Sequence, residues 1–245
     1  MKKGFYHELS VLCTYPHAVR SGNVKGTSQS GDAGEEGDGR DFKRKIHEGN
    51  GDAFPGFERT GTGGGKTLEN RALPVLSVVD PELIVSVPPK FTAFQGFDAL
   101  FHSTECYISK AHNPMGDMLA LTAIENIGKY LVRAVKDGSD LEAREGVAFA
   151  NNLSGQVMTV SCCTSEHSME HAMSACHQEL PHGAGLIMIA EAYYQHFVDC
   201  HACDERFIAM AKALGKADAA CAQDFVDALV KLQKDCVAIF ERAYR

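Results

Sequence analysis

The chain has 245 residues, of which 44% are hydrophobic and 23% charged, and its formal net charge at pH 7 is −8. This composition is usual for a globular protein and argues against a general nucleic-acid binder, because the net charge would repel a polyanion. No run of about 18 apolar residues is present, so we expect no membrane-spanning helix.

The N-terminal part of the chain, residues 1–72, differs in composition from the rest. Residues 1–70 hold 14 of the 23 glycines, and their sequence has neither a helical nor a strand period. Such a segment buries too little apolar surface to offset the entropy lost on ordering. We therefore expect residues 20–70 to be largely irregular.

The sequence becomes regular from residue 73 onward. Residues 73–80 are rich in β-branched side chains and end in Asp-Pro, which predicts a short strand and a turn. Helical periodicity follows, with Asp140 and either Thr164 or Ser165 as N-caps. One strand followed by seven helices predicts a mainly α domain over residues 73–245. The expected helices are 92–109, 117–136, 140–160, 165–176, 182–198, 204–214 and 223–243.

Two pairs of polar residues with helical spacing lie in this apolar region. Asp98 and His102 are four residues apart, as are His167 and His171, and each pair therefore shares a helix face. His182 follows at the start of the next helix. A carboxylate and several imidazoles on facing helices suit a divalent first-row metal. A lone histidine on an apolar face is more often a hydrogen-bonded core residue, so spacing alone leaves both interpretations open.

The same helix offers a rival motif. His167, Glu170 and His171 match H-x-x-E-H, in which two histidines bind zinc and the glutamate activates water in a class of zinc peptidases. Glu241 would be the third ligand. This hypothesis leaves Asp98 and the other histidines without a role.

Three separated blocks resemble the iron-containing alcohol dehydrogenases, most closely the group III type. They are VVDPELIVSVPPKFTAFQGFDALFHSTECYIS, DLEAREGVAFANNLSGQ and SEHSMEHAMSACHQELPHGAGLIM. They occur in the family's order, and the resemblance runs from about residue 73 to about residue 215. It implies the family's helical metal-binding domain, of the type found in dehydroquinate synthase-like proteins.

The resemblance also implies roles for the polar residues. Asp98 and His102 correspond to the family's D-x-x-x-H, His167 to the first histidine of H-x-x-x-H, and His182 to P-H-G; these four would bind the metal. His171 would lie near the nicotinamide and relay a proton.

The chemistry implied is hydride transfer between NAD or NADP and a primary alcohol or aldehyde. Fe²⁺, or Zn²⁺ in its place, would act as a Lewis acid on the substrate oxygen. The family also leads us to expect a possible homodimer.

The N-terminal part departs from the family pattern. Gly61, Thr62 and Gly63 overlap a G-T-G stretch near the family's nicotinamide, and they are our candidate cofactor-binding residues beside His171. No strand, glycine turn and helix precede them, so we interpret residues 1–72 as an irregular or degenerate remnant of a nucleotide-binding domain. A metal-binding helical remnant without catalysis is therefore an alternative function. GTGGGKT lacks the first glycine of a phosphate loop.

Nine cysteines occur at irregular spacing, and the N-terminus lacks the apolar stretch of a secretion signal. We therefore expect reduced thiols in a cytoplasmic protein. Cys200 and Cys203 form a C-x-x-C that could join Cys221 and Cys236 around a structural zinc. We favour a helix end with incidental thiols instead.

Overall fold

The computed structural model describes residues 56–59, 65–68, 78–177 and 179–243. Within these residues the chain forms seven α-helices, one 3₁₀ helix and one pair of short strands, which confirms the expected mainly α class. The elements are β1 (Gly56–Arg59), β2 (Gly65–Leu68), η1 (Pro81–Ile84), α3 (Pro89–Ile108), α4 (Pro114–Lys136), α5 (Leu141–Val160), α6 (Glu166–Cys176), α7 (His182–Asp199), α8 (Asp204–Ala213) and α9 (Gln223–Ala243).

The predicted helices all form, with ends within three residues of their expected positions. Local capping explains much of this agreement. The Asp140 side chain accepts a hydrogen bond from the backbone N–H of Ala143 at 3.0 Å, as an N-cap should. Asn113 caps α4 through the N–H of Gly116 in the same way, with Pro114 as the first helical residue.

The expected strand at 73–80 is wrong where the structure can test it. Residues 78–80 have no regular structure, and residues 73–77 lie outside the described part. Asp80 instead caps η1, because its side chain accepts from the N–H of Glu82 at 3.0 Å. A β-branched run forms a strand only beside a partner strand, and none pairs with it among the described residues.

The segment expected to be largely irregular contains two strands of four residues each. β1 and β2 pair antiparallel, with Gly56 opposite Leu68 and Arg59 opposite Gly65. The remainder of residues 1–77, including Gly61, Thr62 and Gly63, lies outside the described residues.

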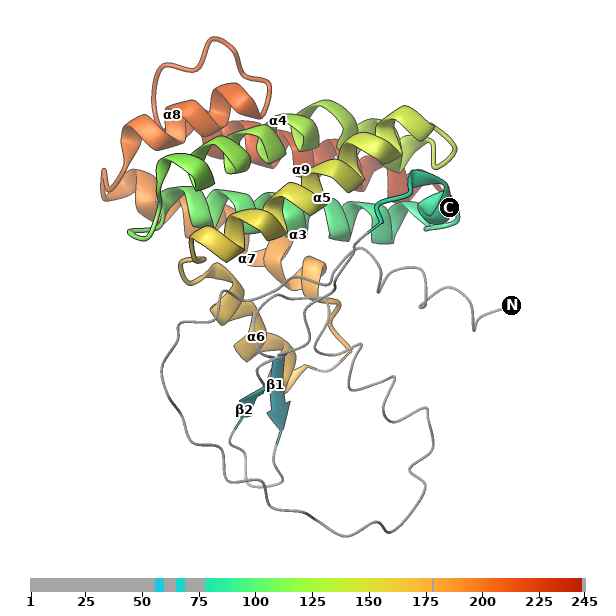
Figure 1. The fold of residues 1–245 in the computed structure, drawn as a ribbon, viewed down its shortest axis with the longest axis horizontal. Helices are drawn as coiled ribbons and strands as arrows, with labels where there is room; N and C mark the ends of the chain where they lie inside the picture. The colour runs from blue at the N-terminus through green and yellow to red at the C-terminus, as the bar shows by residue number, and fades with distance from the viewer. Residues whose placement is uncertain (1–55, 60–64, 69–77, 178, 244–245) are drawn as a thin grey trace, which may run out of the picture.

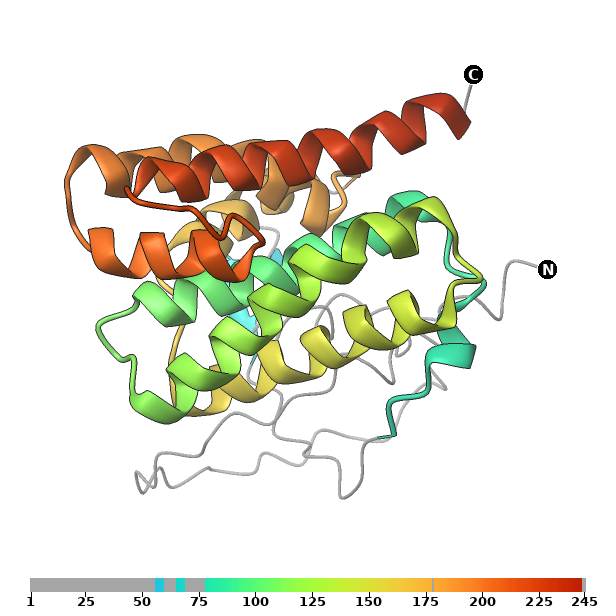
Figure 2. The ribbon, with the colours of Figure 1, turned by 90° about the horizontal axis from the view of Figure 1, so that it is seen from above.

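Helix α3 is the centre of the bundle. It packs against α4, α5, α6, α7, α8 and α9, and most of its residues from Thr92 to Ile108 are buried. Its sequence explains this position, because apolar and small side chains surround the helix on all sides. Figures 1 and 2 show α3, α4 and α5 lying alongside one another, whereas α6 lies at one edge of the bundle.

The core is rich in aromatic contacts. Phe101, Tyr194 and Phe207 are each no more than 1% exposed and join α3, α7 and α8.

Among the described residues, no helix is both long and apolar enough to cross a membrane.

Candidate metal centre

Three polar residues form a stripe along one face of α3. Asp98, His102 and Glu105 are separated by four and three residues, so they share one face of the helix. His102 and Glu105 are buried, with 5% and 0% exposure. This face meets α6 and the start of α7.

The three histidines of the predicted ligand set converge on one carboxylate oxygen. Nε2 of His102 lies 3.4 Å from Oδ1 of Asp98, and Nε2 of His167 and of His182 each lie 3.3 Å from the same oxygen. The residues come from α3, α6 and the first position of α7, so tertiary packing assembles the cluster. Its side chains are 2–25% exposed, which leaves the cluster mostly shielded from water.

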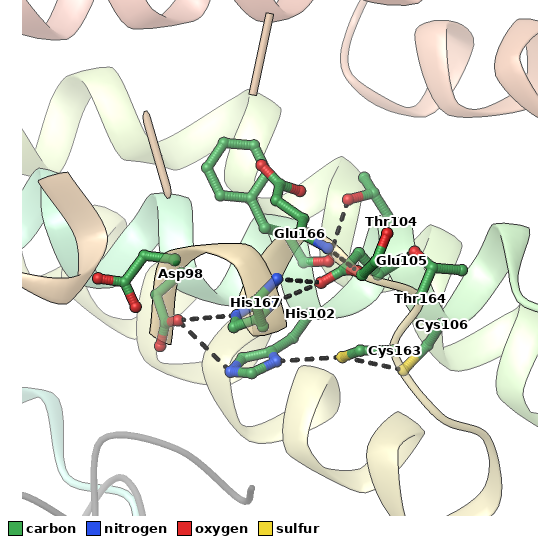
Figure 3. A network of polar contacts seen from close by, with 12 residues as sticks. Asp98, His102, Thr104, Glu105, Cys106, Cys163, Thr164, Glu166 and His167 are labelled. Carbon is green, nitrogen blue, oxygen red and sulfur yellow. Dashed lines mark hydrogen bonds and ion pairs between the residues drawn. The ribbon is translucent and has the colours of Figure 1, made fainter. Parts of the chain in front are cut away.

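Each of these imidazoles is held from behind through Nδ1. Glu105 contacts Nδ1 of His167, Glu170 contacts Nδ1 of His182, and the Cys163 sulfur lies 3.5 Å from Nδ1 of His102. Figure 3 shows the contacts of His102 and His167. A hydrogen bond donated by Nδ1–H leaves the Nε2 lone pair available, which is the usual arrangement for histidines that bind metals.

Glu105 also organises the start of α6. Its carboxylate accepts from the backbone N–H groups of Glu166 at 2.7 Å and His167 at 3.2 Å, and from the Thr164 hydroxyl at 2.8 Å. Ser165 occupies the N-cap position as predicted, but its side chain makes no capping bond. The carboxylate on α3 therefore replaces a local cap, and it fixes the helix that carries His167.

The cluster attracts positive charge. Burial alone would raise the pKa of Asp98, but the imidazoles of His102, His167 and His182 outweigh it and hold this pKa well below its usual range. For His167 the directions are reversed. Burial alone would lower the pKa of this imidazole, but Asp98 and Glu105 raise it to about 10. Carboxylates that draw a proton onto a buried imidazole would equally favour a bound cation.

Glu166 is a further buried carboxyl beside the cluster. Burial, with repulsion from Glu105, raises its pKa well above the usual range. The Tyr194 hydroxyl interacts with it and lies 2.5 Å from the Thr104 hydroxyl. Its surroundings thus disfavour the charged form of this carboxyl.

The metal-ligand donors in the described residues fall into three close groups. Asp98, His167 and His182 form one, His102, Cys163 and His167 another, and Glu170, His171 and His182 the third. The ring of His171 lies 5.3 Å from that of His182, centroid to centroid. The structure thus brings all five predicted residues of the centre together.

The geometry disfavours the zinc-peptidase hypothesis. His167 and His171 do not occur in one donor group among the described residues. Glu170, the expected base, is fully buried and engaged by His182 and by the Ser174 hydroxyl at 2.8 Å. The side chain of Glu241 lies outside the described part.

The two other sequence motifs gain no support as sites. Lys66 lies in β2, whereas a phosphate-loop lysine precedes a helix. Neither Cys200 nor Cys203 belongs to a donor group in the described part of the chain. Cys200 instead lies exposed, 3.9 Å from Nε2 of His196.

Sequence reasoning missed the groups that hold the histidines from behind. Glu105 carried a usable signal, because it extends the Asp98–His102 spacing by one more helical step. No sequence signal indicated the contact of Cys163 with His102 or that of Glu170 with His182, because each contact joins residues from different elements.

Comparison with known proteins identifies the family. A model described as "Fe-containing alcohol dehydrogenase family, C-terminal" matches residues 92–239. Alcohol dehydrogenase 4 of Schizosaccharomyces pombe is 40% identical over 116 residues, which cover 47% of this chain and 27% of that protein. The NAD-dependent methanol dehydrogenase of Bacillus methanolicus is 30% identical over 182 residues, or 69% of this chain and 45% of that one.

A solved structure agrees with these matches. The archaeal alcohol dehydrogenase ADH/D1 from a Red Sea brine pool superposes with a TM-score of 0.66 at 32% identity, covering 70% of this chain and 45% of that chain. This chain thus spans less than half the length of these relatives. The family model nevertheless matches more than half of its residues. The chain therefore belongs to the iron-containing alcohol dehydrogenase family.

Proposed function

We propose that this chain provides the metal centre of an alcohol dehydrogenase or aldehyde reductase, with Asp98, His102, His167 and His182 holding Fe²⁺ or Zn²⁺. The supporting observation is that three Nε2 atoms lie within 3.4 Å of one carboxylate oxygen while each Nδ1 has a partner behind it. A shell of three histidines and one carboxylate suits either ion. The ion, when bound, supplies Lewis-acid polarisation of the substrate oxygen.

The protein side chains set the charge of the centre, limit the access of water and hold a proton. Asp98 lowers the charge of the centre, and the buried imidazoles restrict the access of water. His171, half-buried beside His182, is our candidate for the group that holds the proton exchanged with the substrate oxygen. Its position at the edge of the cluster, and not among the converging Nε2 atoms, supports this role.

The reaction we propose moves a hydride between NAD or NADP and the carbon of a primary alcohol or aldehyde. The name of the Bacillus methanolicus relative, an NAD-dependent methanol dehydrogenase, supports this reaction class. Gly61, Thr62 and Gly63 remain our candidates for contacts with the cofactor.

The test is reduction of butanal by NADH or NADPH, with protein purified without oxygen, loaded with Fe²⁺ and compared with a metal-free control. We expect one metal per chain and turnover that depends on it. His182→Ala should abolish stoichiometric metal binding while the helical circular dichroism persists.

The outcomes separate the two candidate functions. One metal per chain without turnover would identify a metal-binding module with no catalysis of its own. A His182→Ala variant that binds one metal with unchanged affinity would refute the ligand assignment.

A further inference from the structure

Glu170 is a fully buried carboxyl that the proposed reaction does not use. It lies on α6 between His167 and His171. One carboxylate oxygen contacts Nδ1 of His182, and the other accepts from the Ser174 hydroxyl at 2.8 Å. Both oxygens therefore have defined partners, although an isolated buried carboxylate would be strongly destabilising.

The facing helix leaves room for this carboxyl. A Cβ atom at position 185 would lie 2.7 Å from Oε1 and 2.8 Å from Cγ of Glu170. Real side-chain contacts are not so close, so Glu170 can occupy this position only because residue 185 is glycine. The carboxyl thus fits into a space that α7 provides one turn after His182.

Among the three imidazoles, His182 has the least support from packing. Its side chain is 25% exposed, against 7% for His102 and 2% for His167. The rings of His102 and His167 stack with centroids 3.8 Å apart, whereas His182 is the first residue of α7 and lies 5.5 Å from the His167 ring. Its orientation therefore depends more on a hydrogen-bonding partner.

We infer that Glu170 is a positioning residue that aims Nε2 of His182 at Asp98 and thereby sets the affinity of the metal centre. The inference rests on the proposed function, in which His182 is a ligand. A carboxylate that accepts from Nδ1–H fixes the tautomer with a free Nε2 lone pair and makes that nitrogen a stronger donor. Loss of such a partner weakens metal binding by roughly 10–100-fold in other sites.

The experiment measures Zn²⁺ affinity of the full chain by competition with a chromophoric chelator, and the visible spectrum of the Co²⁺ form. Glu170→Ala should bind Zn²⁺ roughly 10–100-fold more weakly and alter the Co²⁺ spectrum. Glu170→Gln should recover most of the affinity, because its amide oxygen can accept from His182 and its NH₂ can donate to the Ser174 hydroxyl. Glu142→Ala, at an exposed glutamate that pairs only with surface groups, is the control and should bind like the wild type.

The outcomes separate this inference from the function beneath it. Wild-type protein that takes up no metal would refute the proposed function. Wild-type protein that binds one ion, together with Glu170→Ala of equal affinity and unchanged Co²⁺ spectrum, would overturn this inference alone. If Glu170→Ala does not fold, Gly185→Ala displaces the same carboxyl while favouring the helix. Weaker Zn²⁺ binding by that variant supports the inference, and unchanged binding overturns it.

Discussion

Replacing Glu105 by glutamine would test whether the carboxylate organises both the fold and the metal centre. Its oxygens accept from four donors, namely the Glu166 and His167 backbone N–H groups, the Thr164 hydroxyl and Nδ1 of His167. An amide has only one acceptor oxygen, so in either orientation its NH₂ faces a buried backbone N–H. If that NH₂ faces His167, Nδ1 must accept, and the proton moves to Nε2, where it blocks coordination.

The magnitude follows from these contacts. A buried N–H without an acceptor costs about 1–3 kcal/mol, and loss of the charged hydrogen bond to His167 adds about 1 kcal/mol. We therefore expect the free energy of unfolding of Glu105→Gln to fall by about 2–4 kcal/mol. Zinc affinity should fall roughly 10–100-fold, because the tautomer with a free Nε2 is no longer fixed.

The pH dependence gives this prediction a second readout in metal-free protein. Despite burial, His167 lowers the pKa of Glu105 from 4.5, so this group stabilises the fold above pH 4.5, and that stability is lost as the pH falls through the lower folded-state value. The pKa of His167 rises from 6.5 to about 10, so its contribution is complete below pH 6.5 and lost as the pH rises through about 10. The difference between wild type and Glu105→Gln should therefore be largest between about pH 4.5 and 6.5.

Urea denaturation, monitored by circular dichroism at each pH, measures the difference in unfolding free energy between wild type and Glu105→Gln. Glu142→Gln is the control, because this glutamate is exposed and pairs only with surface groups. It should leave stability unchanged. A loss below about 1 kcal/mol for Glu105→Gln, or a difference that does not vary with pH, would refute the reasoning.

Three further predictions concern the fold and the metal. The buried Arg144 guanidinium donates to the carbonyls of Gly138 and Val87, both at 2.9 Å, so Arg144→Met should lower the unfolding free energy by about 2–4 kcal/mol in urea without changing zinc affinity. Removal of bound zinc with a chelator should lower the melting temperature, and added zinc should restore it, since 100-fold excess over Kd contributes about 2.7 kcal/mol. Burial raises the pKa of Cys236 to about 12, so iodoacetamide should leave this thiol unmodified until the protein unfolds, whereas it should reach exposed Cys200 in the folded protein.

Helices were predictable because their signals are local. Asp140 marks a helix start by a contact within a few residues, and the structure confirms it. At Ser165 the local signal is not sufficient. The backbone N–H groups at the start of α6 donate to Glu105, which lies on another helix. The expected strand at 73–80 failed at residues 78–80 for a related reason, since strand formation depends on a neighbouring strand.

The candidate ligands were predictable in part. Helical spacing indicated Asp98 with His102 and His167 with His171, but spacing alone could not select His167 over His171 as the residue whose Nε2 meets the carboxylate. Packing decides this, because α6 turns His167 toward Asp98 and leaves His171 beside His182. The family resemblance carried that distinction, whereas periodicity did not.

The buried carboxyls explain why this part of the fold favours function over stability. Glu105, Glu166 and Glu170 are all 0% exposed, and replacing buried charged groups by apolar residues often stabilises a protein. At Glu166, burial and repulsion from Glu105 disfavour the charged form. Glu105 and Glu170 each contact Nδ1 of one imidazole, on the side of the ring away from Asp98. This arrangement gives the folded apoprotein little stability beyond that of an apolar core. A divalent cation among the imidazoles would instead bind rings that the two carboxyl groups already hold in orientation.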